Sequence, residues 1–218
     1  MSQNNKKWYI AQTDLMKKLN FLFLPLMLFT IQAAISQAQI ISTSTVKSID
    51  AYCKTIDAMS EKSKGPEIIF ADTSDYTDAN SKPAWKKFGS EKELEKFRDK
   101  TETYSISYNW LKSGKVVASN FTNFSPSGDW TMYINHVFRA DGSLARVRSE
   151  LRTFQGDYIV IRTQYFNTSG KQVGKTTKFL DLTTHKPKKA SSDFNSSFAS
   201  EDVFKKTSKL PFAAQLKK

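Results

Sequence analysis

Glycine recurs at a fixed interval of fourteen residues through the middle of the chain, and this spacing constrains the fold more than any other feature. The positions are Gly114, Gly128, Gly142, Gly156 and Gly170, which make up five of the chain's eight glycines. The segments between them are rich in Tyr, Phe, Val, Ile and Thr, which favour strands, while glycine readily takes the positive φ of a tight turn. The interval leaves strands of about ten residues between turns of about three or four. It therefore predicts a six-stranded antiparallel meander over about residues 103–182.

Alternation along these strands sorts their side chains into two faces, because successive residues of a strand point to opposite sides. The face predicted to form the core carries Tyr104, Ile106, Tyr108, Trp110, Val117, Phe121, Trp130, Met132, Ile134, Phe138, Val147 and Leu151. The opposite face carries Asn120, Thr122, Phe124, Tyr133, Asn135, Val137, Arg139, Arg146, Arg148, Glu150 and Arg152. This second face is basic at its centre, so we expect it to meet water or a ligand.

The stretch before the meander predicts an amphipathic helix over about residues 46–62. Apolar residues recur there every three or four positions, from Val46 to Met59, and so share one helical face. Gly65 and Pro66 would end the helix. We expect it to cover the apolar face of the meander, which gives a single domain of the α+β class over residues 39–218.

Two shorter elements are predicted between this helix and the meander. Glu67 to Ala71 has the composition of a strand, and Ser90 with Glu93 forms a capping box that opens a charged helix to about Arg98. The residues between them, with Trp85 and Phe88, are predicted to form a polar loop.

The chain from about residue 185 onward is predicted to be a loosely packed tail. We expect a loose stretch over residues 190–197 and a short helix from Ser200 that carries Val203 and Phe204. Phe204, Leu210 and Phe212 are predicted to pack back onto the sheet.

Residues 1–38 are predicted to be a secretory signal peptide, with Met16 as an alternative start. Leu19 to Ile31 is an uncharged run of thirteen residues that follows two lysines and precedes a small-residue exit at Ser36-Gln37-Ala38. A membrane-spanning helix needs about 20 apolar residues, so we expect the run to be cleaved and to leave no stable membrane span. The mature chain would begin at Gln39, in the periplasm or outside the cell, and the style of the signal is bacterial.

The charge of the mature chain indicates which partners it could attract. Without residues 1–38 the chain keeps 29 basic and 20 acidic side chains, a net charge of +9. Outside the cytoplasm this charge would attract anionic lipid, a glycan or another envelope protein, whereas nucleic acid is not expected as a partner. The one cysteine, Cys53, cannot form an internal disulfide and is predicted to be a buried apolar residue.

Sequence motifs supply no catalytic residues, no metal ligands and no cofactor. Of the two histidines, His136 is predicted to be a core residue that makes one hydrogen bond. Asp72, Asp75 and Asp78 recur every third residue, but they lack the spacing of a calcium loop and are predicted to form a solvated acidic loop.

The one cluster that suggests binding lies on the polar face of the meander. Guanidinium groups there, beside a phenol and an amide, could hold phosphate or carboxylate groups. The candidate ligand-binding residues are Arg139, Arg146, Arg148, Arg152, Tyr133 and Asn135. We expect a non-enzymatic binding or interaction protein of the cell envelope, for an anionic ligand or surface. A hydrolase that uses sheet-face carboxylates and a structural envelope component are the alternatives.

The turns at the end of the meander carry a family resemblance. Phe138-Arg-Ala-Asp-Gly142 and Phe166-Asn-Thr-Ser-Gly170, within residues 138–182, resemble small exported bacterial proteins of unknown function. They are loosely similar to MORN-type hairpin repeats, which have a longer period and more glycines. A helix on a long meander is similar in layout to periplasmic lipoprotein carriers and cystatin-like proteins, but layout does not define function.

Overall fold

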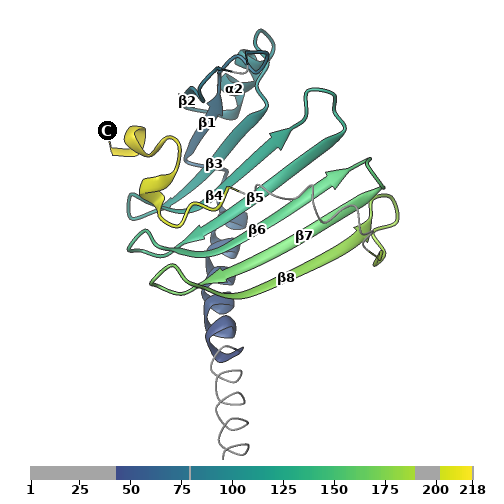
Figure 1. Cartoon of the computed structure of the whole chain (residues 1–218). Coiled ribbons are helices and arrows are strands. Elements are labelled where there is room, and N and C mark those ends of the chain that lie inside the picture. Colours follow the sequence, from purple (N-terminus) through teal and green to yellow (C-terminus); the bar gives the residue numbers. More distant parts are fainter. Residues whose placement is uncertain (1–42, 79, 190–201, 218) are drawn as a thin grey trace, which may run out of the picture. The chain divides into compact units, whose positions relative to one another are not determined.

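The computed structural model describes residues 43–78, 80–189 and 202–217 (Figure 1). These ranges fall almost entirely within the compact unit that runs from Thr45 to Lys218. The predicted signal peptide, its exit at residues 36–38 and the stretch at residues 190–197 lie outside the described residues. No helix within the described ranges has the length and apolar character needed to cross a membrane.

One antiparallel sheet of eight strands organises the unit, in the order β2-β1-β3-β4-β5-β6-β7-β8 (Figure 1). The strands are β1 (Ile68–Asp72), β2 (Trp85–Phe88), β3 (Ser105–Lys112), β4 (Lys115–Phe124), β5 (Trp130–Phe138), β6 (Leu144–Thr153), β7 (Tyr158–Phe166) and β8 (Gln172–Asp181). Strands β3 to β8 form the predicted meander, and the α+β class is confirmed. The predicted count of six strands was too low, since β1 and β2 extend the sheet beyond β3.

The repeated glycines occupy the turns of the meander, as predicted, with φ angles from 73° to 81°. Their turns are nevertheless of different lengths. Between β3 and β4, Ser113 also has a positive φ, 52°, which is typical of a two-residue hairpin turn. The turn between β5 and β6 is longer, because Arg139 N donates to Ser143 O and Gly142 N donates to Arg139 O, both at 2.8 Å. Residues at the same distance from two of these glycines therefore need not lie on the same face of the sheet.

A β-bulge beside the first turn changes which side chains share a face. The pairing of β3 with β4 shifts between Trp110 and Leu111, so Val117 has no directly opposed partner and Trp110 lies opposite Ala118. An extra residue of this kind moves the side chains of a strand to the other face. The assignment of Trp110 to the same face as Phe138 was therefore wrong. The residues predicted for the core face that instead pack on the other side are Ile106, Tyr108, Trp110 and Val117.

The apolar face of the sheet packs against the C-terminal segment. Its core contains Phe70, Val116, Phe121, Ile134, Phe138, Leu144, Val147 and Phe166 together with Leu210 and Phe212. The ring of Phe212 stacks on Phe70 with a centroid distance of 4.1 Å. The predicted packing of Phe204, Leu210 and Phe212 is thus confirmed. The predicted helix at Val203 and Phe204 was wrong, because the segment forms two 3-10 turns, η2 (Thr207–Lys209) and η3 (Ala213–Lys217).

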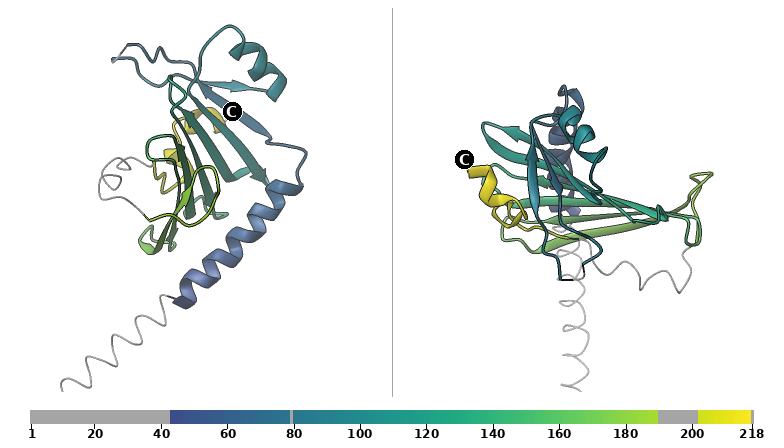
Figure 2. Two further views of the ribbon diagram at one scale, coloured as in Figure 1. Left: turned by 90° about the vertical axis from the view of Figure 1, so that its right-hand side faces the viewer. Right: turned by 90° about the horizontal axis from the view of Figure 1, so that it is seen from above.

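The N-terminal helix, described over residues 43–62, packs on the polar face of the sheet. The prediction that it covers the apolar face was wrong. Its buried residues Ile49, Cys53 and Ile56 contact Val117, Ala118, Val137 and Ala145. Small side chains let it approach closely: a Cβ at Gly174 would come within 2.8 Å of Val46. Cys53 is fully buried, so its prediction as a buried apolar residue is confirmed, and this burial raises its pKa to about 12. Figures 1 and 2 show this helix and the C-terminal segment on opposite sides of the sheet.

The helix α2 (Glu91–Arg98) covers the other end of the polar face. Ser90 caps this helix as predicted, since Ser90 Oγ accepts from Glu93 N at 3.2 Å. The return bond of the capping box is shifted by one residue, because Glu93 Oε2 accepts from Gly89 N at 2.8 Å. Leu94 packs with Ile69, Ala71, Phe88 and Ile106. The two helices cover the two ends of the polar face and leave a groove at its middle.

Candidate functional site

A groove with a volume of about 560 Å³ lies on the polar face, between the N-terminal helix and the sheet. Its lining residues are Asp57, Ser60, Glu61, Trp110, Asn120, Tyr133, Asn135, Arg146, Arg148, Glu150 and Arg152. Five of the six predicted ligand-binding residues gather in it. They do so because β5 and β6 place Asn135 opposite Arg148 and Tyr133 opposite Glu150.

Arg146 joins the helix to the sheet at the groove. Its Nη1 and Nη2 donate to the two carboxylate oxygens of Asp57 at 2.8 and 2.7 Å, and Nη2 also donates to Asn135 Oδ1 at 2.9 Å. The Arg146 side chain is only 8% exposed. Burial opposes its charge, but Asp57 outweighs this effect and raises the pKa of the guanidinium above its ordinary value. The Nε of Arg146 is buried without a hydrogen-bond partner among the described residues.

Glu150 bridges the other two arginines of the groove. It accepts from Arg148 Nη2 at 3.0 Å and from Arg152 Nε and Nη2 at 3.0 and 2.8 Å. The carboxylate is 14% exposed, whereas the Arg148 and Arg152 side chains are 41% and 48% exposed. Burial alone would raise the pKa of Glu150, but the hydrogen bonds from Arg152 and Arg148 outweigh it and lower the pKa. Glu150 is therefore held as an anion between two cations.

Two aromatic side chains bound the groove and are held in place by polar partners. Trp110 Nε1 donates to Ser63 Oγ at 3.0 Å, which fixes the indole beside the end of the helix. The guanidinium of Arg152 lies over the ring of Tyr133, 5.6 Å from its centroid. The groove thus presents aromatic rings, amides, carboxylates and guanidinium groups together.

Arg139, the sixth predicted binding residue, does not line the groove. Its Nη1 donates to Leu144 O at 2.5 Å and its Nη2 donates to Phe166 O at 2.6 Å. The residue follows the last residue of β5 and belongs to the long turn before β6, so its side chain satisfies neighbouring carbonyl groups. The strand alternation used in the prediction does not extend into this turn.

Sequence reasoning missed the groove residues that the helix contributes. Asp57, Ser60 and Glu61 are spaced three and four residues apart, so they form a polar stripe beside the apolar stripe of Cys53 and Ile56. That spacing was visible in the sequence. The prediction placed the helix on the apolar face of the sheet, where this polar stripe could not meet the arginines.

His136 is the predicted core histidine. Its side chain is fully buried, and Nε2 donates to Asp202 O at 2.8 Å, so Nε2 carries a proton. Burial lowers the pKa of His136 to about 4. The residue ties β5 to the C-terminal segment on the apolar face, away from the groove.

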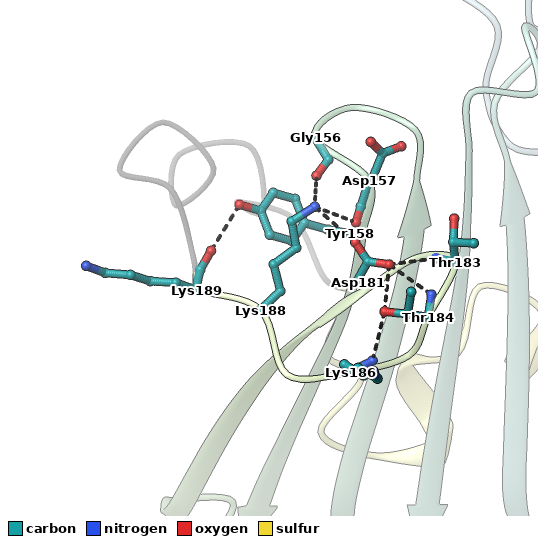
Figure 3. A network of polar contacts seen from close by, with 9 residues as sticks. All are labelled: Gly156, Asp157, Tyr158, Asp181, Thr183, Thr184, Lys186, Lys188 and Lys189. Atoms are coloured by element: carbon teal, nitrogen blue, oxygen red, sulfur yellow. Dashed lines mark hydrogen bonds and ion pairs between the residues drawn. The ribbon is translucent and has the colours of Figure 1, made fainter.

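A second polar cluster closes the end of β7 and β8 (Figure 3). Lys188 Nζ donates to Gly156 O at 2.8 Å and to Asp157 O at 3.1 Å, and it lies 4.6 Å from the centroid of the Tyr158 ring. The Asp181 carboxylate accepts from Thr184 N at 2.8 Å, and such hydrogen bonds lower its pKa to about 2. These contacts join the segment after β8 to the turn between β6 and β7, so Lys188 stabilises the fold.

The acidic loop uses its carboxylates locally. Asp72, Asp75 and Asp78 each accept a hydrogen bond from the backbone N–H two residues further on, at 2.9 to 3.0 Å. Among the residues that the structure describes, no group of three or more His, Cys, Asp or Glu side chains is placed to hold a metal ion.

Fold and site together define an α+β protein in which a polar groove lies between a helix and an antiparallel sheet. No model of a protein family, no curated protein and no solved structure matches the chain. The function is therefore inferred from the geometry and chemistry of the groove.

Proposed function

We propose that the chain is an exported, non-enzymatic binding protein of the cell envelope whose ligand occupies the groove and carries an acidic group. The observation that carries this proposal is the pair Arg148 and Arg152, which is half-exposed at the groove. Glu150 accepts from one nitrogen of Arg148 and two of Arg152, which leaves further N–H groups on both guanidinium groups. Such groups bind carboxylates and phosphates with charge-assisted hydrogen bonds.

The two alternatives have less support. A hydrolase needs a carboxylic acid that keeps its proton near neutral pH, which requires a raised pKa. Among the described residues that line the groove, Glu150 is the one carboxylate on the sheet, and its pKa is lowered. A purely structural component would gain little from a partly buried set of ion pairs, because their desolvation cancels much of their attraction.

Export rests on the predicted signal peptide, and it has its own test. Expressed from the full gene in a bacterium, the protein should be recovered outside the cytoplasm with Gln39 at its N-terminus. Mass spectrometry of the exported protein decides this. Retention of residues 19–31 in that material would contradict the assignment of a cleaved signal.

Binding is tested by exchanging the charges of the groove. The double variant Arg148→Gln/Arg152→Gln should lose at least tenfold in affinity for polygalacturonate at low salt, because both outer guanidinium groups are removed. The control Lys175→Gln/Lys178→Gln removes the same charge from β8, whose residues do not line the groove. Equal losses in the two variants would mean that retention follows total charge alone, and the proposal would be wrong.

Lys188 is unsuitable as a control in this experiment. Its ammonium group donates to two backbone carbonyl groups and lies near the carboxylate of Asp181, at 3.4 Å (Figure 3). Neutralising it would change the fold as well as the charge.

A further inference from the structure

The groove is balanced in charge, although the protein as a whole is basic. Three arginines line it, and so do three acids, Asp57, Glu61 and Glu150. Two of these acids are committed to ion pairs with the arginines. Like-charge repulsion among the arginines is therefore already relieved by the protein itself, and net charge alone does not explain what would bind.

The hydrogen-bonding capacity of the groove is more selective than its charge. A fully ionised phosphate only accepts hydrogen bonds, so it can use the outer N–H groups of Arg148 and Arg152 but offers no proton to Glu150, whose carboxylate is 14% exposed. A protonated amine only donates, so it would draw Glu150 away from the arginines and leave them unpaired. A hydroxyl group both accepts and donates, so it can accept from an arginine and donate to Glu150 at the same time.

The amides of the groove have the same dual character. Asn120 and Asn135 are directly opposed on β4 and β5, so their side chains lie next to each other on the polar face. Asn135 Oδ1 accepts from Arg146, which leaves its NH2 group as a donor. Beside them, Trp110 is fixed by Ser63 and offers a rigid apolar surface.

We infer that the ligand is a saccharide with a carboxylate, such as a uronic acid unit of an acidic glycan. This rests on the proposed function and narrows it. The ring hydroxyls hydrogen-bond to Glu150 and the two asparagines, and the C–H face of the sugar ring packs on an aromatic side chain. The carboxylate accepts from the outer N–H groups of Arg148 and Arg152. The volume of about 560 Å³ lies within the range of about 300–1,000 Å³ that small-molecule sites occupy, so the groove holds a short segment of a chain.

Titration calorimetry with defined probes tests this inference. The probes are trisaccharides of galacturonate, glucuronate and mannuronate, the neutral trisaccharide maltotriose, inorganic phosphate, and vesicles of phosphatidylglycerol. At least one uronate trisaccharide should bind at least tenfold more tightly than maltotriose, and phosphate should not compete with it. Failure of all three uronates, equal binding of maltotriose, or preferred binding of phosphate or vesicles would overturn the inference.

The variant Glu150→Gln separates this inference from the proposed function. Removing a negative charge strengthens the binding of a ligand that is recognised only as an anion. A saccharide hydroxyl instead exchanges a charged acceptor for the weaker amide oxygen of Gln, and the second carboxylate oxygen becomes a donor, so the affinity for the uronate should fall about tenfold. Stronger binding in Glu150→Gln would overturn the saccharide and leave an anionic ligand in place. No effect of Arg148→Gln/Arg152→Gln on any probe would overturn both, with unchanged thermal unfolding as the check that each variant is folded.

Discussion

The two faces of the sheet use the same strands in opposite ways. On one face Phe70, Phe138 and Phe212 are essentially fully buried and pack ring against ring or against aliphatic side chains. On the other, Arg146 and Glu150 are partly or mostly buried as ion pairs, and a groove remains between them and the helix. Because residues alternate along β4 to β6, each strand supplies the core with every second side chain and the groove with the others. Stability and binding are thus separated by face.

The segments that cover the two faces differ in the same sense. The C-terminal segment inserts Leu210 and Phe212 into the apolar core, so it completes that core. The N-terminal helix rests on Ala118 and Ala145 near one end of the strands and contributes Asp57 to the groove. The first contact fills a hydrophobic core, and the second positions polar groups.

The largest effect should come from truncating the C-terminal anchor. Phe212→Ala should lower the free energy of unfolding by about 3–5 kcal/mol, because it removes a fully buried ring from the apolar core. Urea unfolding measures this change. The matched control is Phe154→Ala, since Phe154 is 68% exposed, and it should cost less than about 0.5 kcal/mol. Similar losses in both variants would show that the segment is not part of the core.

Lowering the pH should reduce the stability of the fold through the buried His136. The pKa of His136 is lowered to about 4 in the folded protein, against an ordinary value of 6.5, so between these values the unfolded chain binds more protons. Stability should fall as the pH decreases from about 6.5 to about 4, by about 3 kcal/mol from this residue. His136→Gln should flatten the profile of unfolding free energy against pH in that window. An unchanged slope in the variant would contradict the assignment.

Breaking the ion pair at the groove should cost less than breaking the apolar core. Asp57→Asn should destabilise the fold by about 2 kcal/mol. Breaking a fully buried ion pair costs about 3–5 kcal/mol, and the loss is smaller here because Asp57 is 33% exposed. Glu61→Gln removes the same charge from the same helix, where Glu61 makes no ion pair with a described residue, and should change stability by less than about 0.5 kcal/mol. Equal effects in thermal unfolding would mean that helix charge, not the pair, is responsible.

The smallest effect on folding is expected where the segment after β8 meets the turn between β6 and β7. Lys188→Gln should cost about 1 kcal/mol, because it removes the donor to the carbonyl groups of Gly156 and Asp157. Lys189→Gln should be close to neutral, since Tyr158 contacts the backbone of Lys189 and not its side chain (Figure 3). Equal unfolding midpoints for the two variants would contradict a stabilising role for the Lys188 side chain.

The glycine period was enough to predict the meander, its turns and the α+β class, because turn chemistry is local. The faces were harder to predict. Trp110 and Phe138 both precede a turn glycine by four residues, yet they lie on opposite faces, because one turn is short and a bulge adds Val117. The strand β2, which pairs with β1, has only four residues, and two of them are lysines. Its sequence therefore has no hydrophobic alternation that would predict a strand. The basic groove residues were found because β5 and β6 pair without irregularity through that region.

The indole N–H signals of the tryptophans test the separation of the faces most directly. Trp110 lines the groove, whereas Trp85 packs against Phe212 on the apolar face, at 5.4 Å between ring centroids, and Trp130 is not among the groove residues. Indole resonances can be followed by two-dimensional NMR during titration with a uronate trisaccharide, with Trp110→Phe to assign the signal. The Trp110 signal should move with saturation while those of Trp85 and Trp130 stay in place. Movement of Trp85 or Trp130 with an unchanged Trp110 would contradict a ligand site on the polar face.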